Sequence, residues 1–587
     1  MLRFAMGDRI ETLRSLMRAR GWDAVVLTGS DPHGSEYPAE RYKQVRYLTG
    51  FTGEAGDIVV TLDHAGLWTD SRYFLQAREQ LPPGCVLHKT RVPDEEPIPD
   101  FLLRQLGPDA VIAIDSLCTD SRFAASLTGD VIRVPDLLNT LWQDRPAIPQ
   151  TPVFTVETGE SRREKTGRIR EALRERKADA VLLTALDEIA WTLNVRASDI
   201  EYNPYVISYL LISDEEVRWF VRKDPVEDAD TAAAFRALEA DGVILDDYDA
   251  IFQSLTGFGC LWADGGSLNE ELGSILRESG VRLLDAPTPA CLLKAVKNSV
   301  EITRLRETHV QDGLVMERFL YWLERSMMAD KTVSEWDASV KLGQLRAGLG
   351  GYQGDSFETI SARGASAALP HYVTPRENAP LLEPEGLYLC DSGGQFLGGT
   401  TDITRTVPLG PCSPEACEDY TLVLKGHIAL AMAVFPAGTP GCRLDALARA
   451  PLWQARRNFG HGTGHGVGFF LGVHEGPQSI RQDLNPQALL PGMVVSCEPG
   501  IYREGLYGIR HENLLLCVDD GDNDFGGWLR FEPLTLCHFD TAILQRELLT
   551  EPERAWLNAY NARVRDTLCP LLDTATAAWL RAKCTAI

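Results

Sequence analysis

The sequence predicts a mixed α/β fold, with two related α/β domains in tandem ahead of a third, larger domain. Residues 23–28 read DAVVLT, and a near copy, DAVLLT, stands at residues 179–184. A segment with helical apolar periodicity precedes each copy, so a helix followed by a buried strand occurs twice. Two proline-containing stretches, 144–152 and 284–289, disfavour regular structure and mark the joints between the three regions.

The first domain is expected at residues 1–146 and the second at residues 147–296. In the first domain, Ile10, Leu13 and Met17 recur at the spacing of one helical face. The second domain repeats the order of a helix and an apolar strand, and further strands follow that strand. The repeat therefore predicts two copies of one kind of sheet.

The third domain, residues 297–587, is expected to begin with a long helix at 299–325. Helices then alternate with glycine-rich strands to about residue 540. The tail at 551–583 is predicted to be helical, because aromatic and aliphatic residues recur there at core spacing.

Composition excludes several classes of protein. The chain has 58 basic and 83 acidic side chains, a net charge of −25, which disfavours non-specific binding to nucleic acid or anionic membranes. No apolar run reaches the roughly 18 residues that a spanning helix needs. The first residues lack the apolar core of a signal peptide, and the 13 scattered cysteines show no paired spacing. We therefore expect a cytoplasmic protein with reduced thiols and with neither nucleic-acid nor membrane partners.

Four acidic residues of the third domain stand in or next to apolar, strand-like segments: Asp391, Asp402, Glu498 and Glu512. Asp402 is expected inside a strand at 400–406. One such carboxylate alone would be interpreted as a solvated strand end. Four carboxylates on apolar strands are costly to bury as bare anions, so the set predicts bound cations or protons.

A histidine motif lies close to these acids in the sequence. Residues 459–468 read FGHGTGHGVG, and their alternating glycines make a helix unfavourable. In an extended chain His461 and His465 would point to the same side, and a flexible turn would not need a histidine at both positions. His474 follows in the segment VHEGP, whereas His427 lies in an apolar helix and is interpreted as structural.

Four carboxylates with one imidazole form a hard, oxygen-rich ligand set, which suits Mn²⁺, Mg²⁺ or Fe²⁺ better than a thiolate zinc site. The number of acids suggests two metals with bridging carboxylates, roughly 3.5–4 Å apart. Cys390 and Cys497 each precede a proposed ligand, and strand alternation points them away from it. Both are interpreted as core residues.

Taken together, these segments resemble the pita-bread metallopeptidases: aminopeptidase P, prolidase and methionine aminopeptidase, with creatinase as a metal-free relative. The resemblance covers essentially the whole chain and is strongest to the long, three-domain, cytosolic-type aminopeptidase P. It rests on PHY at 370, DSGG at 391, TDITRT at 401, GHGTGHGVG at 460, VHEGP at 473, CEPG at 497, GIRHEN at 508 and FEPLTL at 531. The last motif, with the helical tail, distinguishes the long form.

The resemblance implies two creatinase-like N-terminal α/β domains and a pita-bread catalytic domain. It also implies a homodimer formed through the catalytic domain, and removal of the first residue from peptides whose second residue is proline. Two divalent cations are implied, with Mn²⁺ the first choice and Mg²⁺, Fe²⁺, Co²⁺ and Zn²⁺ as alternatives. Their implied ligands are Asp391, Asp402, His465, Glu498 and Glu512, of which Asp402 and Glu512 bridge the ions.

Three histidines are implied to bind the substrate and the transition state: His371, His461 and His474. Glu498 is implied to accept and later return the proton, so it belongs to the catalytic set as well. Arg510 is expected to share a strand face with Glu512 and to orient the ligands. His511 departs from the family, which has an aliphatic residue there, and should face away from the metals.

Two other interpretations of the function stay open. A prolidase, which cleaves only Xaa-Pro dipeptides, would share the five ligands, although the long form favours aminopeptidase P. A pita-bread domain can also serve as a binding module after losing its ligands, as creatinase relatives lose their metals. All five ligand positions are intact here, which disfavours that reading.

Overall fold

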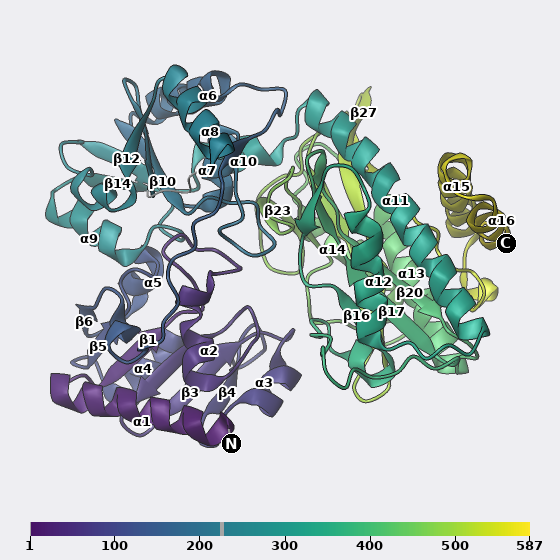
Figure 1. Cartoon of the computed structure of the whole chain (residues 1–587), viewed down its shortest axis with the longest axis horizontal. Helices are drawn as coiled ribbons and strands as arrows, with labels where there is room; N and C mark the ends of the chain where they lie inside the picture. The colour runs from purple at the N-terminus through teal and green to yellow at the C-terminus, as the bar shows by residue number, and fades with distance from the viewer. Residues whose placement is uncertain (1, 224–227) are drawn as a thin grey trace. The chain divides into compact units, whose positions relative to one another are not determined.

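The computed structural model describes residues 2–223 and 228–587 (Figure 1). The chain divides into two compact units between Cys291 and Leu292. Each unit combines helices with sheets, which confirms the mixed α/β class. The expected domain boundaries after residues 146 and 296 stay a prediction.

The first unit contains two six-stranded sheets with the same topology. Their strand orders are β4-β3-β2-β1-β5-β6 and β12-β11-β10-β8-β13-β14. In both, the strand predicted from the repeated motif lies in the interior, antiparallel to one neighbour and parallel to the other. The outer pairings also correspond, one antiparallel and two parallel in each sheet. The internal repeat is thereby confirmed.

The strands of these sheets are β1 (Ala24–Leu27), β2 (Asp57–Thr61), β3 (Ala65–Thr69), β4 (Val86–Lys89), β5 (Val111–Ile114), β6 (Asp130–Arg133), β8 (Ala180–Leu183), β10 (Ser208–Ser213), β11 (Val217–Val221), β12 (Val243–Asp247), β13 (Cys260–Ala263) and β14 (Arg282–Asp285). Strands β7 (Phe154–Thr155) and β9 (Val195–Arg196) form a separate two-stranded sheet. The helices are α1 (Leu2–Arg20), α2 (Gln44–Thr49), α3 (Phe74–Gln80), α4 (Ile98–Leu106), α5 (Ser121–Ser126), α6 (Arg162–Arg176), α7 (Leu186–Leu193), α8 (Ala229–Ala240) and α9 (Glu270–Glu278). Helix α10 (Pro289–Ala295) spans the division between the units.

Apolar periodicity explains why the first helices form where they do. Ile10, Leu13 and Met17 of α1 are buried against the first sheet, as predicted. Helix α6 begins at a capping box, in which Ser161 and Glu164 each accept a hydrogen bond from the other's backbone amide. Local sequence therefore sets the start of the helix, and burial of the apolar face holds it in place.

The two sheets of the first unit meet through a reciprocal contact. Asp120 and Asn269, the N-caps of α5 and α9, form an antiparallel bridge with each other. The amide after each cap donates to the carbonyl before the other cap, at 2.7 and 2.8 Å. The next amides repeat the exchange at 3.2 and 3.0 Å. The two halves of the unit are thus related by an approximate twofold axis.

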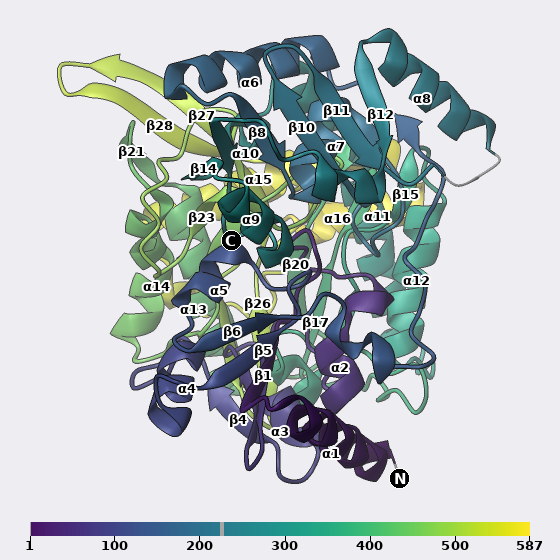
Figure 2. The same cartoon turned by 90° about the vertical axis from the view of Figure 1, so that its left-hand side faces the viewer.

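Packed helix pairs and four sheets make up the second unit, among them the three-stranded sheets β15-β18-β19 and β16-β17-β20. Helices α11 (Ser299–Met328) and α12 (Glu335–Ala347) pack together beside the sheet β16-β17-β20, and α13 (Pro414–Ala431) packs on α14 (Asp445–Gln454) (Figure 1). The larger sheet has the order β21-β28-β27-β24-β22-β23. Figure 2 shows the hairpin of β27 and β28 reaching beyond the rest of this sheet.

The strands of this unit are β15 (Tyr352–Asp355), β16 (Ile360–Arg363), β17 (Leu387–Ser392), β18 (Gly394–Phe396), β19 (Gly399–Thr400), β20 (Ile403–Pro408), β21 (Val434–Pro436), β22 (Gly464–Gly466), β23 (Glu475–Ile480), β24 (Val494–Cys497), β25 (Gly500–Arg503), β26 (Tyr507–Arg510), β27 (Asn513–Asn523) and β28 (Gly526–Pro533). The predicted helical tail forms α15 (Glu551–Leu568) and α16 (Thr574–Lys583). Leu557 and Tyr560 of α15 are buried in the core, as their spacing predicted.

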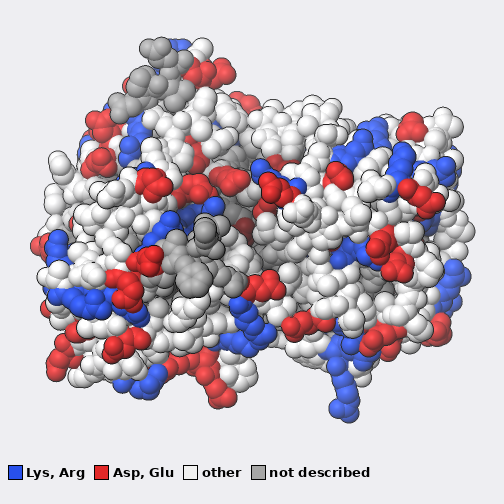
Figure 3. All heavy atoms as spheres, turned by 60° about the horizontal axis from the view of Figure 1, so that its bottom comes forward, with Lys and Arg blue, Asp and Glu red and all other residues white. Residues whose placement is uncertain are grey.

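Two expectations from composition can be compared with the structure. All 13 cysteines lie in the described ranges, and each is a free thiol. Within those ranges, every helix is too short or too polar to cross a bilayer. Figure 3 shows acidic and basic side chains interspersed on one face of the molecule.

Candidate metal centre and catalytic site

The four candidate carboxylates converge in the second unit from the ends of different strands. Asp391 lies in β17, Glu498 directly follows β24, and Glu512 lies between β26 and β27. The expectation that Asp402 lies inside a strand is wrong, because it occupies the short link between β19 and β20. These strands belong to different sheets, so the chain crosses from one sheet to the other at Asp402.

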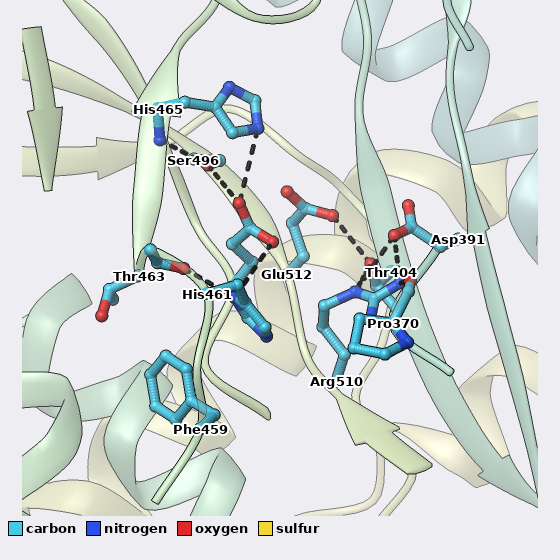
Figure 4. A network of polar contacts seen from close by, with 12 residues as sticks. Pro370, Asp391, Thr404, Phe459, His461, Thr463, His465, Ser496, Arg510 and Glu512 are labelled. Atoms are coloured by element: carbon cyan, nitrogen blue, oxygen red, sulfur yellow. Dashed lines mark hydrogen bonds and ion pairs between the residues drawn. The ribbon is translucent and has the colours of Figure 1, made fainter. Parts of the chain in front are cut away.

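His465 joins this cluster from β22. Its Nε2 lies 3.5 Å from Oδ2 of Asp402 and 3.5 Å from Oε1 of Glu498. Asp402, His465 and Glu512 each offer one ligand atom, and these atoms all lie within 4.8 Å of one another. Figure 4 shows His465, Glu512 and Asp391 approaching the same space from separate segments of the chain. The residue types and their separation fit a divalent cation.

The electrostatics of the cluster also fit cations. Burial raises the pKa of Glu512 well above its ordinary value, and repulsion from the other three carboxylates adds to the effect. Burial likewise raises the pKa of Glu498 to about 7, although His465 and Arg510 act against it. Asp391 Oδ1 is buried and has no hydrogen-bond partner among the described residues. Crowded anions and an unpartnered oxygen are the features that bound divalent ions would satisfy.

Arg510 anchors the Asp391 side of the cluster. Its Nη2 and Nε lie 2.5 and 3.0 Å from Asp391 Oδ2, and Nη2 also donates to the carbonyl of Pro370 at 3.3 Å. The predicted strand face shared with Glu512 is wrong, since β26 ends at Arg510 and β27 begins only at Asn513. The orienting contact is made to Asp391 instead.

His461 faces Glu498 from a bend ahead of β22, with Nδ1 3.9 Å from Oε2. Its Nε2 lies 2.7 Å from the hydroxyl of Tyr502, and Nδ1 lies 2.7 Å from the carbonyl of Gly462. Arg510 donates to the same Tyr502 oxygen at 2.6 Å, so the hydroxyl proton points to His461. Burial lowers the pKa of His461 well below its ordinary value. The ring is therefore neutral and carries its proton on Nδ1.

The other two candidate histidines lie around the same centre. The ring of His474 stands perpendicular to that of His465, with centroids 4.3 Å apart. His371 lies close enough to His461 for its charge to lower the pKa of that ring. The carbonyl of the preceding residue, Pro370, accepts the Arg510 hydrogen bond, which holds this loop at the site. All nine predicted site residues are thus brought together.

Sequence reasoning missed several supporting residues. Thr404 donates to Glu512 at 2.8 Å, and Tyr502 links Arg510 to His461. Thr404 alternates with Thr406 along β20, and the Thr406 hydroxyl donates to the Arg510 carbonyl. This period-two row of threonines was the signal that could have found Thr404.

A buried arginine holds the loop that carries His461. Arg449 of α14 donates to the carbonyls of Phe459 and His461 at 2.7 and 2.8 Å. Its Nε donates to Asp445 at 2.7 Å, and its guanidinium lies 3.8 Å from the centre of the Phe459 ring. The other oxygen of Asp445 accepts a hydrogen bond from Thr463 at 2.6 Å. Helix α14 thereby fixes both ends of the segment 459–463.

Residues interpreted as structural lie away from the ligands. His427 is buried, with Nδ1 3.0 Å from the carbonyl of Cys497, and burial lowers its pKa to about 3. His511 packs edge-on against Tyr420 and Phe539, which agrees with the expectation that it faces away. Cys390 and Cys497 belong to apolar core clusters.

Known families match along the whole length of the chain. The model of metallopeptidase family M24 matches residues 303–519, and models described as the creatinase/prolidase N-terminal domain match 9–140 and 144–301. A model of the C-terminal region of the M24 peptidases matches 527–587. A probable Xaa-Pro aminopeptidase P of Laccaria bicolor is 39% identical, covering 98% of this chain and 93% of the relative. Xaa-Pro aminopeptidase 1 of Dictyostelium discoideum is 34% identical, covering 98% and 95%.

Solved structures give the same grouping. The X-prolyl aminopeptidase of Caenorhabditis elegans, described as a cytosolic enzyme with a di-nuclear active site, matches with a TM-score of 0.93 and 33% identity over 99% of this chain and 100% of that one. The Xaa-Pro dipeptidase of Bacillus anthracis matches with a TM-score of 0.51 and 26% identity over 64% of this chain and 98% of that one.

The fold and the family matches define a metallopeptidase of the pita-bread class, with creatinase-like domains ahead of the M24 domain. More narrowly, the chain belongs to the aminopeptidase P family, as its full-length relatives show. It is therefore a metallo-exopeptidase, and the family resemblance predicted from the sequence is confirmed.

Proposed function

We propose that the chain hydrolyses the bond between the first residue of a peptide and a proline in the second position. The observation that carries the proposal is the convergence of four carboxylates and His465, with three further histidines around them, in a chain that matches Xaa-Pro aminopeptidases over 98% of its length. A non-catalytic binding module would not need this ligand set.

Five residues would hold two divalent cations: Asp391, Asp402, His465, Glu498 and Glu512. When bound, two such cations supply a hydroxide nucleophile near neutral pH and a positive charge for the developing oxyanion. Mn²⁺ is the proposed metal, because four carboxylates and one imidazole form a hard donor set. Mg²⁺, Fe²⁺, Co²⁺ and Zn²⁺ are the alternatives that metal analysis would distinguish.

The protein's own groups handle the proton and the substrate. Glu498 lies within 4 Å of both His465 and His461, where it can accept a proton and later return it to the leaving proline nitrogen. His461 donates its Nδ1–H to the Gly462 carbonyl in this structure, and it would exchange that acceptor for the oxyanion when the substrate binds. His371 is proposed as the second donor. His474, beside His465, is proposed to hold the carbonyl of the substrate proline.

Proline in the second position explains why a dedicated peptidase is needed. Its nitrogen carries no N–H, and its ring fixes φ, so an enzyme that grips backbone N–H groups would fail on this bond. A site that reads the ring by shape and holds the carbonyls with histidine N–H groups avoids that requirement.

Prolidase activity is the competing proposal within the same chemistry. The dipeptidase of Bacillus anthracis matches only 64% of this chain, whereas the X-prolyl aminopeptidase matches 99%. Hydrolysis of Arg-Pro-Pro and of Ala-Pro, each with and without Mn²⁺, tests the proposal. We expect release of arginine from the tripeptide in the presence of Mn²⁺. Cleavage of Ala-Pro alone would establish a prolidase instead.

We further propose a cytosolic homodimer. The Caenorhabditis elegans relative is a cytosolic enzyme, which supports the location. The long-form resemblance supports assembly through the catalytic domain. Light scattering at micromolar concentration should give about twice the chain mass of 64.9 kDa, and a value near 64.9 kDa would contradict the dimer.

A further inference from the structure

Two histidines of the first sheet lie in direct contact, far in sequence from the carboxylate cluster. His64 occupies the turn between β2 and β3, and His88 lies on the edge strand β4. Their Nε2 atoms are 3.1 Å apart, and both side chains are partly exposed. The catalytic proposal uses neither of them.

The surroundings hold both rings in this position. The ring of His88 stacks on Trp68 with centroids 3.7 Å apart and planes 4° from parallel. Phe101 contacts both imidazoles, at centroid distances of 4.9 and 5.3 Å. Gly66 lies beneath them, and a Cβ there would come within 2.6 Å of His64 Nε2 and 2.8 Å of His88 Nε2. The absence of a side chain at Gly66 thus leaves the space in which the two rings meet.

We propose that His64 and His88 bind one late transition-metal ion of the Zn²⁺, Ni²⁺ or Cu²⁺ class through their Nε2 atoms, at a site separate from the carboxylate centre. Imidazole nitrogen binds such ions at about 2.0–2.1 Å. Nitrogens 3.1 Å apart can both reach one ion at that distance, with an angle of roughly 95–100° at the metal. This angle lies between those of square-planar and tetrahedral coordination.

The protons on the two rings can rearrange so that a metal ion replaces the direct contact between the Nε2 atoms. A direct contact needs one ring to donate from Nε2, whereas a metal needs the lone pair of both Nε2 atoms. Moving that proton to Nδ1 of the same ring frees the second lone pair, so neutral rings bind the ion without net proton release. Burial lowers the pKa of His64, and it lowers that of His88 to about 4, so both rings are neutral at pH 7. Water molecules can fill the coordination positions of the ion that the two imidazoles leave open.

The chemistry of the ligands separates this site from the catalytic one. Two imidazoles favour borderline ions such as Zn²⁺, Ni²⁺ and Cu²⁺, whereas the carboxylate cluster suits Mn²⁺. A metal here would also tie the edge strand β4 to the β2–β3 turn. Each chain should therefore bind more Ni²⁺ ions than Mn²⁺ ions. The additional ion should stabilise the first sheet.

A second histidine cluster makes a useful contrast. His538 directs its backbone amide and its Nδ1 to Glu317, both at 2.8 Å, and Cys537 lies beside them. All three are buried, and the pKa of the thiol is raised well above its ordinary value. Their donors and acceptors are already matched within the core, so this group is explained as a buried hydrogen-bonded pair.

The test uses the full chain with its carboxylate centre saturated by Mn²⁺. Ni²⁺ is then titrated by calorimetry, and Cu²⁺ is added in a parallel sample for electron paramagnetic resonance. We expect one additional Ni²⁺ per chain and a Cu²⁺ spectrum with coupling to two nitrogens. His64→Gln and His88→Gln should each weaken this binding by more than about 10–100-fold, the loss typical of removing even an outer-shell partner of a metal.

Lys89→Gln, an exposed change on the same strand, is the matched control and should bind Ni²⁺ like the unchanged chain. Peptidase activity with Mn²⁺ should be equal in all variants, which shows that each has folded. Equal Ni²⁺ stoichiometry and affinity in the unchanged chain and both histidine variants would overturn the proposal. A Cu²⁺ spectrum without two-nitrogen coupling would overturn it as well.

Discussion

Arg449 offers a test of how the fold positions His461, the proposed catalytic histidine. Arg449→Lys keeps a positive charge beside Asp445, but its single nitrogen cannot occupy the three positions from which Nε, Nη1 and Nη2 donate to Asp445 and the two carbonyls. The carbonyls of Phe459 and His461, now 2.7 and 2.8 Å from the guanidinium, would lose their donors. We therefore expect the loop to shift while the ion pair with Asp445 persists.

The magnitude follows from these contacts. A buried acceptor left without a partner costs about 1–3 kcal/mol, so two carbonyls reduce the free energy of unfolding by roughly 2–6 kcal/mol. A displacement of about 1 Å at a catalytic group can lower turnover on the order of 10²-fold. The variant should therefore show a kcat lower by about that factor, with its Mn²⁺ content unchanged, because Arg449 contacts none of the five proposed ligands.

The assay is hydrolysis of Arg-Pro-Pro, measured together with metal content and thermal unfolding. Arg457→Lys is the matched control, since Arg457 also pairs with a buried aspartate, Asp419, at 3.1 Å but contacts no site residue. The control should lose stability and keep its kcat. An Arg449→Lys enzyme with unchanged kcat, or one that has lost its metal, would refute the reasoning.

Three further outcomes are expected. Asp402→Asn should lose bound metal and turnover together, because one of the proposed ligands loses its charge; an active variant with its full metal content would contradict this. His461→Ala should keep its metal while kcat falls on the order of 10²–10³-fold, whereas His465→Ala should lose both. Removing metal with a chelator should lower the melting temperature, since an ion at 100 times its Kd stabilises the folded state by about 2.7 kcal/mol; scanning calorimetry with and without Mn²⁺ would show it.

Much of this fold could be predicted from local patterns. The copy of DAVVLT at residues 179–184 predicted a repeated sheet, and the two sheets share one strand order. Period-two alternation placed Asp391 in β17 and directed Cys390 into the core. These inferences succeeded because strand alternation and helical periodicity are set by neighbours in sequence.

The rest depended on contacts between distant segments. Asp402 lies where the chain crosses between two sheets, which no local pattern reveals. Arg510 reaches Asp391, 119 residues earlier, rather than its sequence neighbour Glu512. The proton position on His461 follows from Tyr502 and Arg510, which only the folded chain brings together. Tertiary packing decides such pairings. The sequence alone therefore predicted the residues of the site but not the contacts between them.

The reciprocal exchange of hydrogen bonds between α5 and α9 has an evolutionary consequence. Matching groups that contact each other both ways are the mark of an interface between two identical subunits. The first unit therefore has, within one polypeptide, the arrangement of an isologous dimer, which is the arrangement that duplication and fusion of a gene would produce. Tethering makes the association intramolecular, so neither half has to remain identical to the other. Asp120 and Asn269 are such a pair, because they cap equivalent helices with different side chains.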